Sequence, residues 1–190
     1  MPVEIEAKMK VDSLDPVRDR LKAAGASMIG EYLETNTFFD TDDRSLLAAD
    51  EGLRIRRAED QSTGKQTITI TFKGPRQHGK LKSREEIELT VNDSDIATRL
   101  LESLGYRRMM SFQKKRQSWK LGACRVELDE LPQLGVYVEI EGPNEEAILK
   151  IRESLHLQDR ALVKASYVAL LMAHLQEQGN HVKNVTFAKQ

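Results

Sequence analysis

The chain has 190 residues and is 31% charged, yet its net charge is only −1. This length fits one domain with a sizeable hydrophobic core. The charge balance argues against a general nucleic-acid or membrane surface, which needs a basic excess, and the single Cys124 excludes an internal disulfide framework and a cysteine-based zinc site.

The N-terminus lacks the charged and apolar regions of a signal peptide, and no apolar run approaches the roughly 18 residues of a membrane span. We therefore expect a cytoplasmic protein that binds neither membrane nor nucleic acid. Its oligomeric state stays open between monomer and homodimer.

The first segment, residues 3–10, alternates strictly between apolar and charged side chains. This period predicts a half-buried strand, whose charged face carries Glu4, Glu6, Lys8 and Lys10. A helix follows, with Pro16 in its first turn and Gly25 at its end.

Alternation and turn residues predict the other strands over residues 27–39, 53–57, 66–73, 82–91, 106–121, 123–128 and 136–142. Helical spacing predicts helices over 93–104, 144–155 and 164–178, and a short helix or loop over 42–50. Strands joined by short turns, with helices between pairs, predict one antiparallel α+β domain over residues 1–178. The polar residues 179–190 are predicted to be a flexible tail.

Seven of the eight predicted strands carry charged side chains at every second position. An open sheet would leave this charged face in water, whereas a closed barrel would turn it into a polar tunnel with apolar side chains outside, under the helices. In a tunnel, the acidic group would be Glu4, Glu6, Asp129, Glu139 and Glu141. The basic group would be Lys8, Arg54, Arg56, Lys73, Arg84, Lys114 and Arg116.

Carboxylates suit a hard divalent cation, and Arg and Lys suit phosphate oxygens, so a linear triphosphate with Mg²⁺ matches both groups.

Several short motifs follow one another along the chain. They are Glu4-x-Glu6-x-Lys8, Leu53-Arg54-Ile55-Arg56, Phe72-Lys73-Gly74-Pro75, Ser83-Arg84-Glu85-Glu86-Ile87-Glu88, Lys114-x-Arg116, Leu128-Asp129, Glu139-x-Glu141 and Ser166-Tyr167. Together they resemble the CYTH superfamily, also called triphosphate tunnel metalloenzymes, and most closely its prokaryotic branch of class IV adenylate cyclases and thiamine triphosphatase-like proteins. The resemblance implies an eight-stranded antiparallel closed β-barrel, a triphosphate tunnel, with helices packed outside.

By this resemblance, the five carboxylates of the acidic group hold one or two Mg²⁺ or Mn²⁺ ions, and the seven residues of the basic group hold the phosphates. Glu4, Glu6 and Lys8 are the expected catalytic residues, with both glutamates near the metal that activates the nucleophile. Catalysis would consist mostly of positioning and charge stabilisation.

Other residues allow a structural interpretation. Glu86 and Glu88 are expected to balance neighbouring arginines, because buried charges must be paired, and Glu127 stays open as a metal ligand. Lys164 fits a phosphate contact and a solvated helix end equally well. Trp119 is expected in the hydrophobic core.

The expected activity is hydrolysis of inorganic or organic triphosphate by water. The alternative is a class IV adenylate cyclase, in which the ATP 3′-hydroxyl attacks the α-phosphorus and gives cyclic AMP and pyrophosphate. A non-catalytic polyphosphate or nucleotide sensor is the second alternative, although a pure binder would need only the basic residues. No stretch indicates an adenine site, so inorganic triphosphate, thiamine triphosphate and ATP all stay open as substrates.

Overall fold

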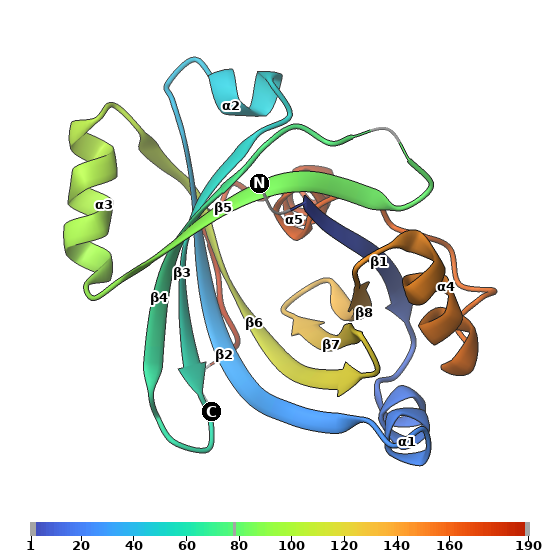
Figure 1. Ribbon diagram of the computed structural model, residues 1–190. Coiled ribbons are helices and arrows are strands. Elements are labelled where there is room, and N and C mark those ends of the chain that lie inside the picture. Colours follow the sequence, from blue (N-terminus) through green and yellow to red (C-terminus); the bar gives the residue numbers. More distant parts are fainter. Residues whose placement is uncertain (1–2, 78, 189–190) are drawn as a thin grey trace.

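The computed structural model describes residues 3–77 and 79–188. Its barrel strands are β1 (Val3–Val11), β2 (Ser27–Asp40), β3 (Gly52–Asp60), β4 (Gln66–Lys73), β5 (Lys82–Val91), β6 (Arg107–Leu121), β7 (Cys124–Leu131) and β8 (Gly135–Glu141). They lie in the order β2-β3-β4-β5-β1-β8-β7-β6, and β2 also pairs with β6, so the sheet closes on itself. All these pairings are antiparallel, which confirms the predicted closed β-barrel (Figure 1).

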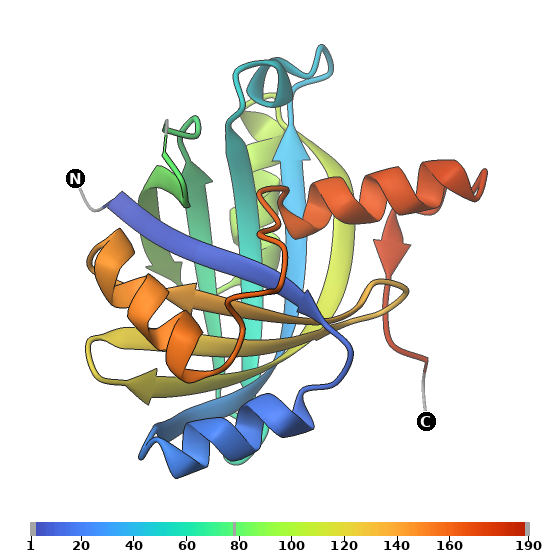
Figure 2. The same cartoon turned by 90° about the vertical axis from the view of Figure 1, so that its right-hand side faces the viewer.

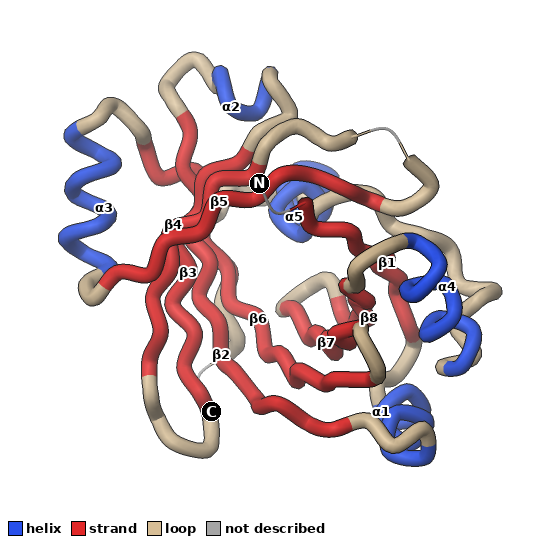
Figure 3. Tube along the Cα trace, viewed as in Figure 1, coloured by secondary structure: helices blue, strands red, loops and turns tan. Residues whose placement is uncertain are grey.

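The described part of the chain has five helices, and in Figure 3 the first four lie outside the ring of strands, whereas the last lies within its outline. They are α1 (Asp15–Ala23), α2 (Ser45–Ala48), α3 (Ser94–Ser103), α4 (Glu145–Ser154) and α5 (Tyr167–Glu177). One core cluster of outward-facing apolar side chains lies under α1 and α4, and another under α2 and α3. By contrast, α5 packs on Phe112 and Tyr137, which share the face of their strands with Lys114 and Glu139, so this third cluster lies on the inward face of the barrel. None of the described helices is long and apolar enough to cross a membrane.

This packing fixes the direction of every strand side chain, because successive residues of a strand point to opposite faces. Apolar residues of β1 join the core outside the barrel, and Glu4, Glu6 and Lys8 point into the tunnel, whereas Lys10 is exposed. Trp119 on β6 belongs to the outer core, as predicted.

The last helix begins later than predicted. The segment before Tyr167 is extended and runs beside β1, where Leu162 forms a bridge with Met9 and the Val163 N–H donates to the Lys8 carbonyl at 2.8 Å. The Ser166 side chain caps the helix, so Lys164 precedes α5 instead of starting it.

A short strand β9 (Asn184–Val185) pairs in parallel with β6 and buries Val185. The predicted domain boundary after residue 178 and the flexibility of the tail stay predictions.

Candidate active site

A cavity of about 460 Å³ runs inside the barrel. Eleven of the twelve predicted site residues line it, and only Asp129 is absent from its lining. Strand register brings them together, since Glu6 lies opposite Glu141, and Lys8 opposite Glu139. The sequence therefore predicted eleven side chains that share this cavity, and their roles stay predictions.

Three carboxylates form a cluster on the tunnel wall. Single oxygen atoms of Glu4, Glu6 and Glu141 all lie within 4.8 Å of one another. Burial and the charge of Glu4 raise the pKa of Glu141 to about 8. Burial makes the larger contribution to this rise, and the neighbouring carboxylate adds to it. Three convergent carboxylate oxygens are hard ligands and fit a divalent cation such as Mg²⁺ or Mn²⁺.

Glu86 shares a hydrogen bond with Glu4 beside this cluster. Burial and this hydrogen bond raise the pKa of Glu86 to about 7. Burial alone would raise the pKa of Glu4 as well, but the hydrogen bond from Glu86 and the charge of Lys73 lower it to about 2. Glu4 is therefore ionised at neutral pH. Lys73 also forms an ion pair with Glu86, so the observed partner is a lysine where the sequence predicted neighbouring arginines.

Asp129 belongs to a different network, on the basic side of the tunnel. Its two oxygens accept from Arg116 at 2.7 Å each, and Lys114 lies 3.3 Å away. Tyr167 of α5 donates its hydroxyl to the same carboxylate at 2.9 Å. The structure thus surrounds Asp129 with donors and places it apart from the three-carboxylate cluster. Its role as a metal ligand stays a prediction.

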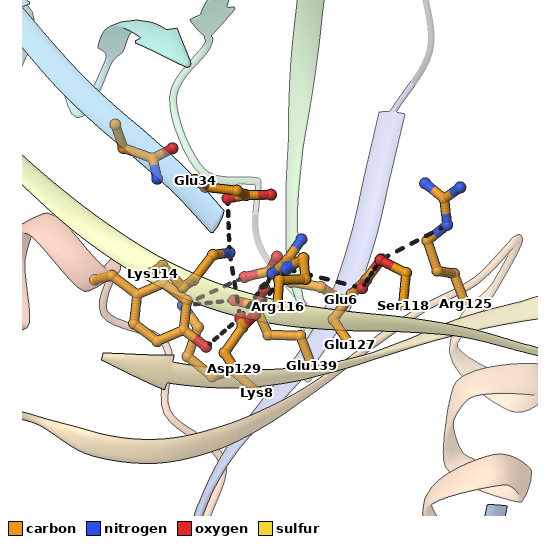
Figure 4. Close-up of polar contacts among 12 residues, drawn as sticks. Glu6, Lys8, Glu34, Lys114, Arg116, Ser118, Arg125, Glu127, Asp129 and Glu139 are labelled. Atoms are coloured by element: carbon orange, nitrogen blue, oxygen red, sulfur yellow. Dashed lines mark hydrogen bonds and ion pairs between the residues drawn. The ribbon is translucent and has the colours of Figure 1, made fainter. Parts of the chain in front are cut away.

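Glu139 contacts two members of the basic group. It pairs with Lys8 at 3.1 Å and accepts a hydrogen bond from Arg116 (Figure 4). Burial opposes its ionisation, but the charges of Lys8 and Arg116 outweigh burial and hold the pKa of Glu139 well below its usual range. Glu139 is therefore a fixed anion that aligns two of the predicted phosphate-binding residues.

Several donors that line the tunnel lack a partner. The buried Arg54 Nε, Arg84 Nε and Asn36 Nδ2 make no hydrogen bond within the described part of the chain. A buried donor without a partner is costly, so three donors around one cavity indicate an anionic ligand with several oxygens. A linear chain of phosphates supplies such oxygens.

The sequence analysis missed three polar residues of this site. Glu34 is buried on β2, with Arg56 at 3.2 Å and Lys114 at 3.3 Å. Asn36, two residues further on, accepts from Arg56 at 2.9 Å. Lys82, at the start of β5, pairs with Glu6 at 2.6 Å. The alternation of Glu34, Asn36 and Phe38 was a readable signal, but only one of the three is charged.

The residues with open interpretations also have defined places. Glu88 accepts from the Thr71 hydroxyl at 3.0 Å, and Thr71 accepts from Arg54 at 2.9 Å. Glu127 accepts from Ser118 at 2.5 Å, outside the three-carboxylate cluster. Lys164 donates to the Gly79 carbonyl at 3.2 Å.

Comparison with known protein families shows that residues 2–167 match the CYTH domain. A Methanocaldococcus jannaschii protein named "Putative adenylate cyclase MJ0240" is 27% identical over 177 residues, which cover 88% of this chain and 98% of that protein. Adenylate cyclase CyaB of Aeromonas hydrophila is 29% identical over 159 residues, 83% of this chain and 78% of that protein. These matches confirm the resemblance drawn from the motifs.

Solved structures share the fold. The PH1819 protein of Pyrococcus horikoshii superposes with a TM-score of 0.79 at 26% identity, covering 90% of this chain and 98% of that chain. HpAC1 of Hippeastrum, described as an adenylyl cyclase with a dominant triphosphatase activity, superposes with a TM-score of 0.65 and covers 94% of this chain and 97% of that chain. Because the two sequences are only 19% identical, this comparison shows a shared fold but does not show a shared activity.

Proposed function

Because this chain belongs to the CYTH domain family, we propose that it is a divalent-metal-dependent enzyme that hydrolyses inorganic or organic triphosphates. One observation carries the proposal: a cluster of three carboxylates and three unpartnered buried donors line the same cavity. The cluster fits a hard cation, and the donors fit phosphate oxygens.

In this proposal Glu4, Glu6 and Glu141 hold Mg²⁺ or Mn²⁺. The other two predicted carboxylates, Glu139 and Asp129, bind residues of the basic group. When bound, the metal neutralises phosphate charge and lowers the pKa of a coordinated water. Glu4 contributes a full negative charge at neutral pH, because its pKa is about 2.

The basic group binds and orients the substrate. Arg54 and Arg84 each offer a free Nε–H to phosphate oxygens. Lys8, held 3.1 Å from Glu139, contributes a fixed positive charge beside the acidic cluster. Asp129 keeps Arg116 and Lys114 in place through its hydrogen bonds. Phosphoryl transfer needs little covalent chemistry from the protein, so these charges perform most of the catalysis by positioning and electrostatic stabilisation.

Adenylate cyclase activity is the alternative, and the names of the two relatives favour it. In that reaction the 3′-hydroxyl of ATP attacks the α-phosphorus, and pyrophosphate leaves. The same tunnel would hold the triphosphate, so the two reactions differ in which phosphorus meets the nucleophile. A cytoplasmic location and a monomeric or homodimeric state stay part of the proposal.

The test offers inorganic triphosphate, thiamine triphosphate and ATP in parallel to the purified protein, with Mg²⁺, with Mn²⁺ and with EDTA. We expect metal-dependent orthophosphate release and no cyclic AMP. Cyclic AMP with an equal amount of pyrophosphate would establish the alternative. Tight triphosphate binding without any product would overturn both in favour of a sensor.

A further inference from the structure

The Ser166-Tyr167 motif has no role in the proposed chemistry so far. Ser166 caps α5 by accepting from the Ala169 N–H at 3.4 Å, which makes Tyr167 the first residue of the helix. Tyr167 is buried and lines the tunnel, because α5 packs on inward-facing side chains such as Phe112 and Tyr137. The cap therefore fixes an aromatic ring from α5 against the site.

The segment that leads into α5 contacts both the backbone and the ammonium group of Lys8. Figure 2 shows this segment crossing β1 before the helix begins. The Val163 N–H donates to the Lys8 carbonyl at 2.8 Å, and the Lys8 ammonium donates to the Ala165 carbonyl at 3.1 Å. The backbone and the charged end of one predicted catalytic residue are thus tied to the same short stretch.

The Tyr167 ring then contacts two ammonium groups that come from different strands. Lys8 Nζ lies 4.1 Å from the ring centroid, and Lys114 Nζ lies 5.4 Å from it. An aromatic face within about 6 Å attracts a cation without bringing a counter-charge. The two ammonium groups, which also pair with carboxylates, are therefore gathered around one neutral surface that adds no further negative charge.

The orientation of the ring is fixed from two further directions. Its hydroxyl donates to Asp129 Oδ2 at 2.9 Å, and Tyr137 packs edge-on against it at 5.3 Å between centroids. Burial and the charge of Asp129 keep the pKa of Tyr167 well above its usual value, so the hydroxyl remains a donor. Removal of the hydroxyl alone would leave the ring wedged by Tyr137 and would leave Asp129 bound to Arg116.

We propose that Tyr167 is a positioning residue for triphosphate binding, whose ring sets the places of the Lys8 and Lys114 ammonium groups. The inference rests on the proposed function, since it takes the triphosphate as the ligand of these groups. The inference adds a residue of α5 to a site that is otherwise built from barrel strands.

The test measures binding of inorganic triphosphate by calorimetry in EDTA, so that neither metal nor turnover enters the result. Tyr167→Phe keeps the ring, and we expect its Kd within about threefold of the unchanged chain. Tyr167→Leu removes the ring and should weaken binding by about tenfold, as expected for loss of partly desolvated cation–π contacts.

Leu171→Ala is the matched control. Leu171 is fully buried in the same core cluster under α5 but has no aromatic ring to attract an ammonium group. We expect this variant to lower the melting temperature and to bind triphosphate within about threefold of the unchanged chain, a difference below the tenfold step that corresponds to about 1.4 kcal/mol.

Equal losses of binding in Leu171→Ala and Tyr167→Leu would reduce Tyr167 to a packing role and overturn the inference. Unchanged binding by Tyr167→Leu would overturn it too, and would leave the proposed function intact. If the unchanged chain bound no triphosphate, the proposed function and the inference would fall together.

A second measurement does not require the leucine variant to fold. The ring 4.1 Å from Lys8 Nζ should shift the adjacent Lys8 methylene protons upfield in the NMR spectrum of the unchanged chain and of Tyr167→Phe. Ordinary chemical shifts for these protons would contradict the geometry on which the inference stands.

Discussion

Replacement of Glu141 by Gln should stabilise the metal-free protein at alkaline pH, although it removes a residue from the centre of the site. Glu141 is half-buried beside Glu4, and its pKa is raised from 4.5 to about 8. Below pH 4.5 both the folded and the unfolded chain keep this proton, so no penalty exists. Above pH 4.5 the carboxyl group ionises in the unfolded chain but stays protonated in the folded chain, so the free energy of unfolding falls as the pH rises. The fall ends near pH 8, where Glu141 also ionises in the folded chain.

The size of the effect follows from the shift. Each pKa unit is worth about 1.4 kcal/mol, so a rise from 4.5 to about 8 sets an upper limit of about 5 kcal/mol above pH 8. At pH 7 this destabilisation already amounts to about 3 kcal/mol. Gln has nearly the same shape and no charge, and it should recover this free energy at pH 8 and almost none of it at pH 4.

The assay is urea denaturation followed by circular dichroism, in EDTA at pH 4, 6 and 8. Glu146→Gln is the control, because Glu146 is exposed on α4 five residues further on. Mg²⁺ should reverse the order, since it stabilises only the chain that keeps all three carboxylates. A Glu141→Gln variant that is less stable than the unchanged chain at pH 8 without metal would refute the reasoning.

Three further substitutions separate the parts of the site. Glu4→Gln should lower orthophosphate release at limiting Mg²⁺ by more than about 100-fold, because loss of a direct ligand exceeds the cost of a supporting residue; near-normal turnover would sink the metal assignment. Arg56→Ala should raise the triphosphate Kd by about 10- to 100-fold, the loss of one charge-assisted hydrogen bond, and leave Mn²⁺ affinity unchanged by calorimetry; the reverse result would refute the charge sorting. Asp129→Asn should destabilise the fold by about 2 kcal/mol, because it removes a charge-assisted partner from the buried Arg116 and Lys114, although Glu139 still pairs with Arg116. An unchanged thermal melt would argue against that network.

The inward and outward faces of the strands could be predicted from the sequence, because alternation assigns each side chain to a face without knowledge of the partner strands. This is why eleven predicted residues do line one cavity. The closure of the sheet does not follow from alternation, since an open sheet has the same pattern. The ordered motifs favoured the barrel, and the β2–β6 pairing confirms it.

The division of the carboxylates into two networks could not be predicted. It depends on register, which places Glu141 opposite Glu6 and Glu139 opposite Lys8. It also depends on Tyr167, which reaches Asp129 from a helix 38 residues away in the chain. The start of that helix was readable, because Ser166 is a good cap immediately before an apolar run.

The most direct test of the account is a titration of Mg²⁺ into the unchanged chain and into Glu4→Gln, with orthophosphate release from inorganic triphosphate as the readout. The account predicts saturable, metal-dependent release by the unchanged chain, and at limiting Mg²⁺ almost none by the variant, which should still bind triphosphate in EDTA. Equal release by both proteins, or release by the unchanged chain in EDTA, would contradict a metal site at the three-carboxylate cluster.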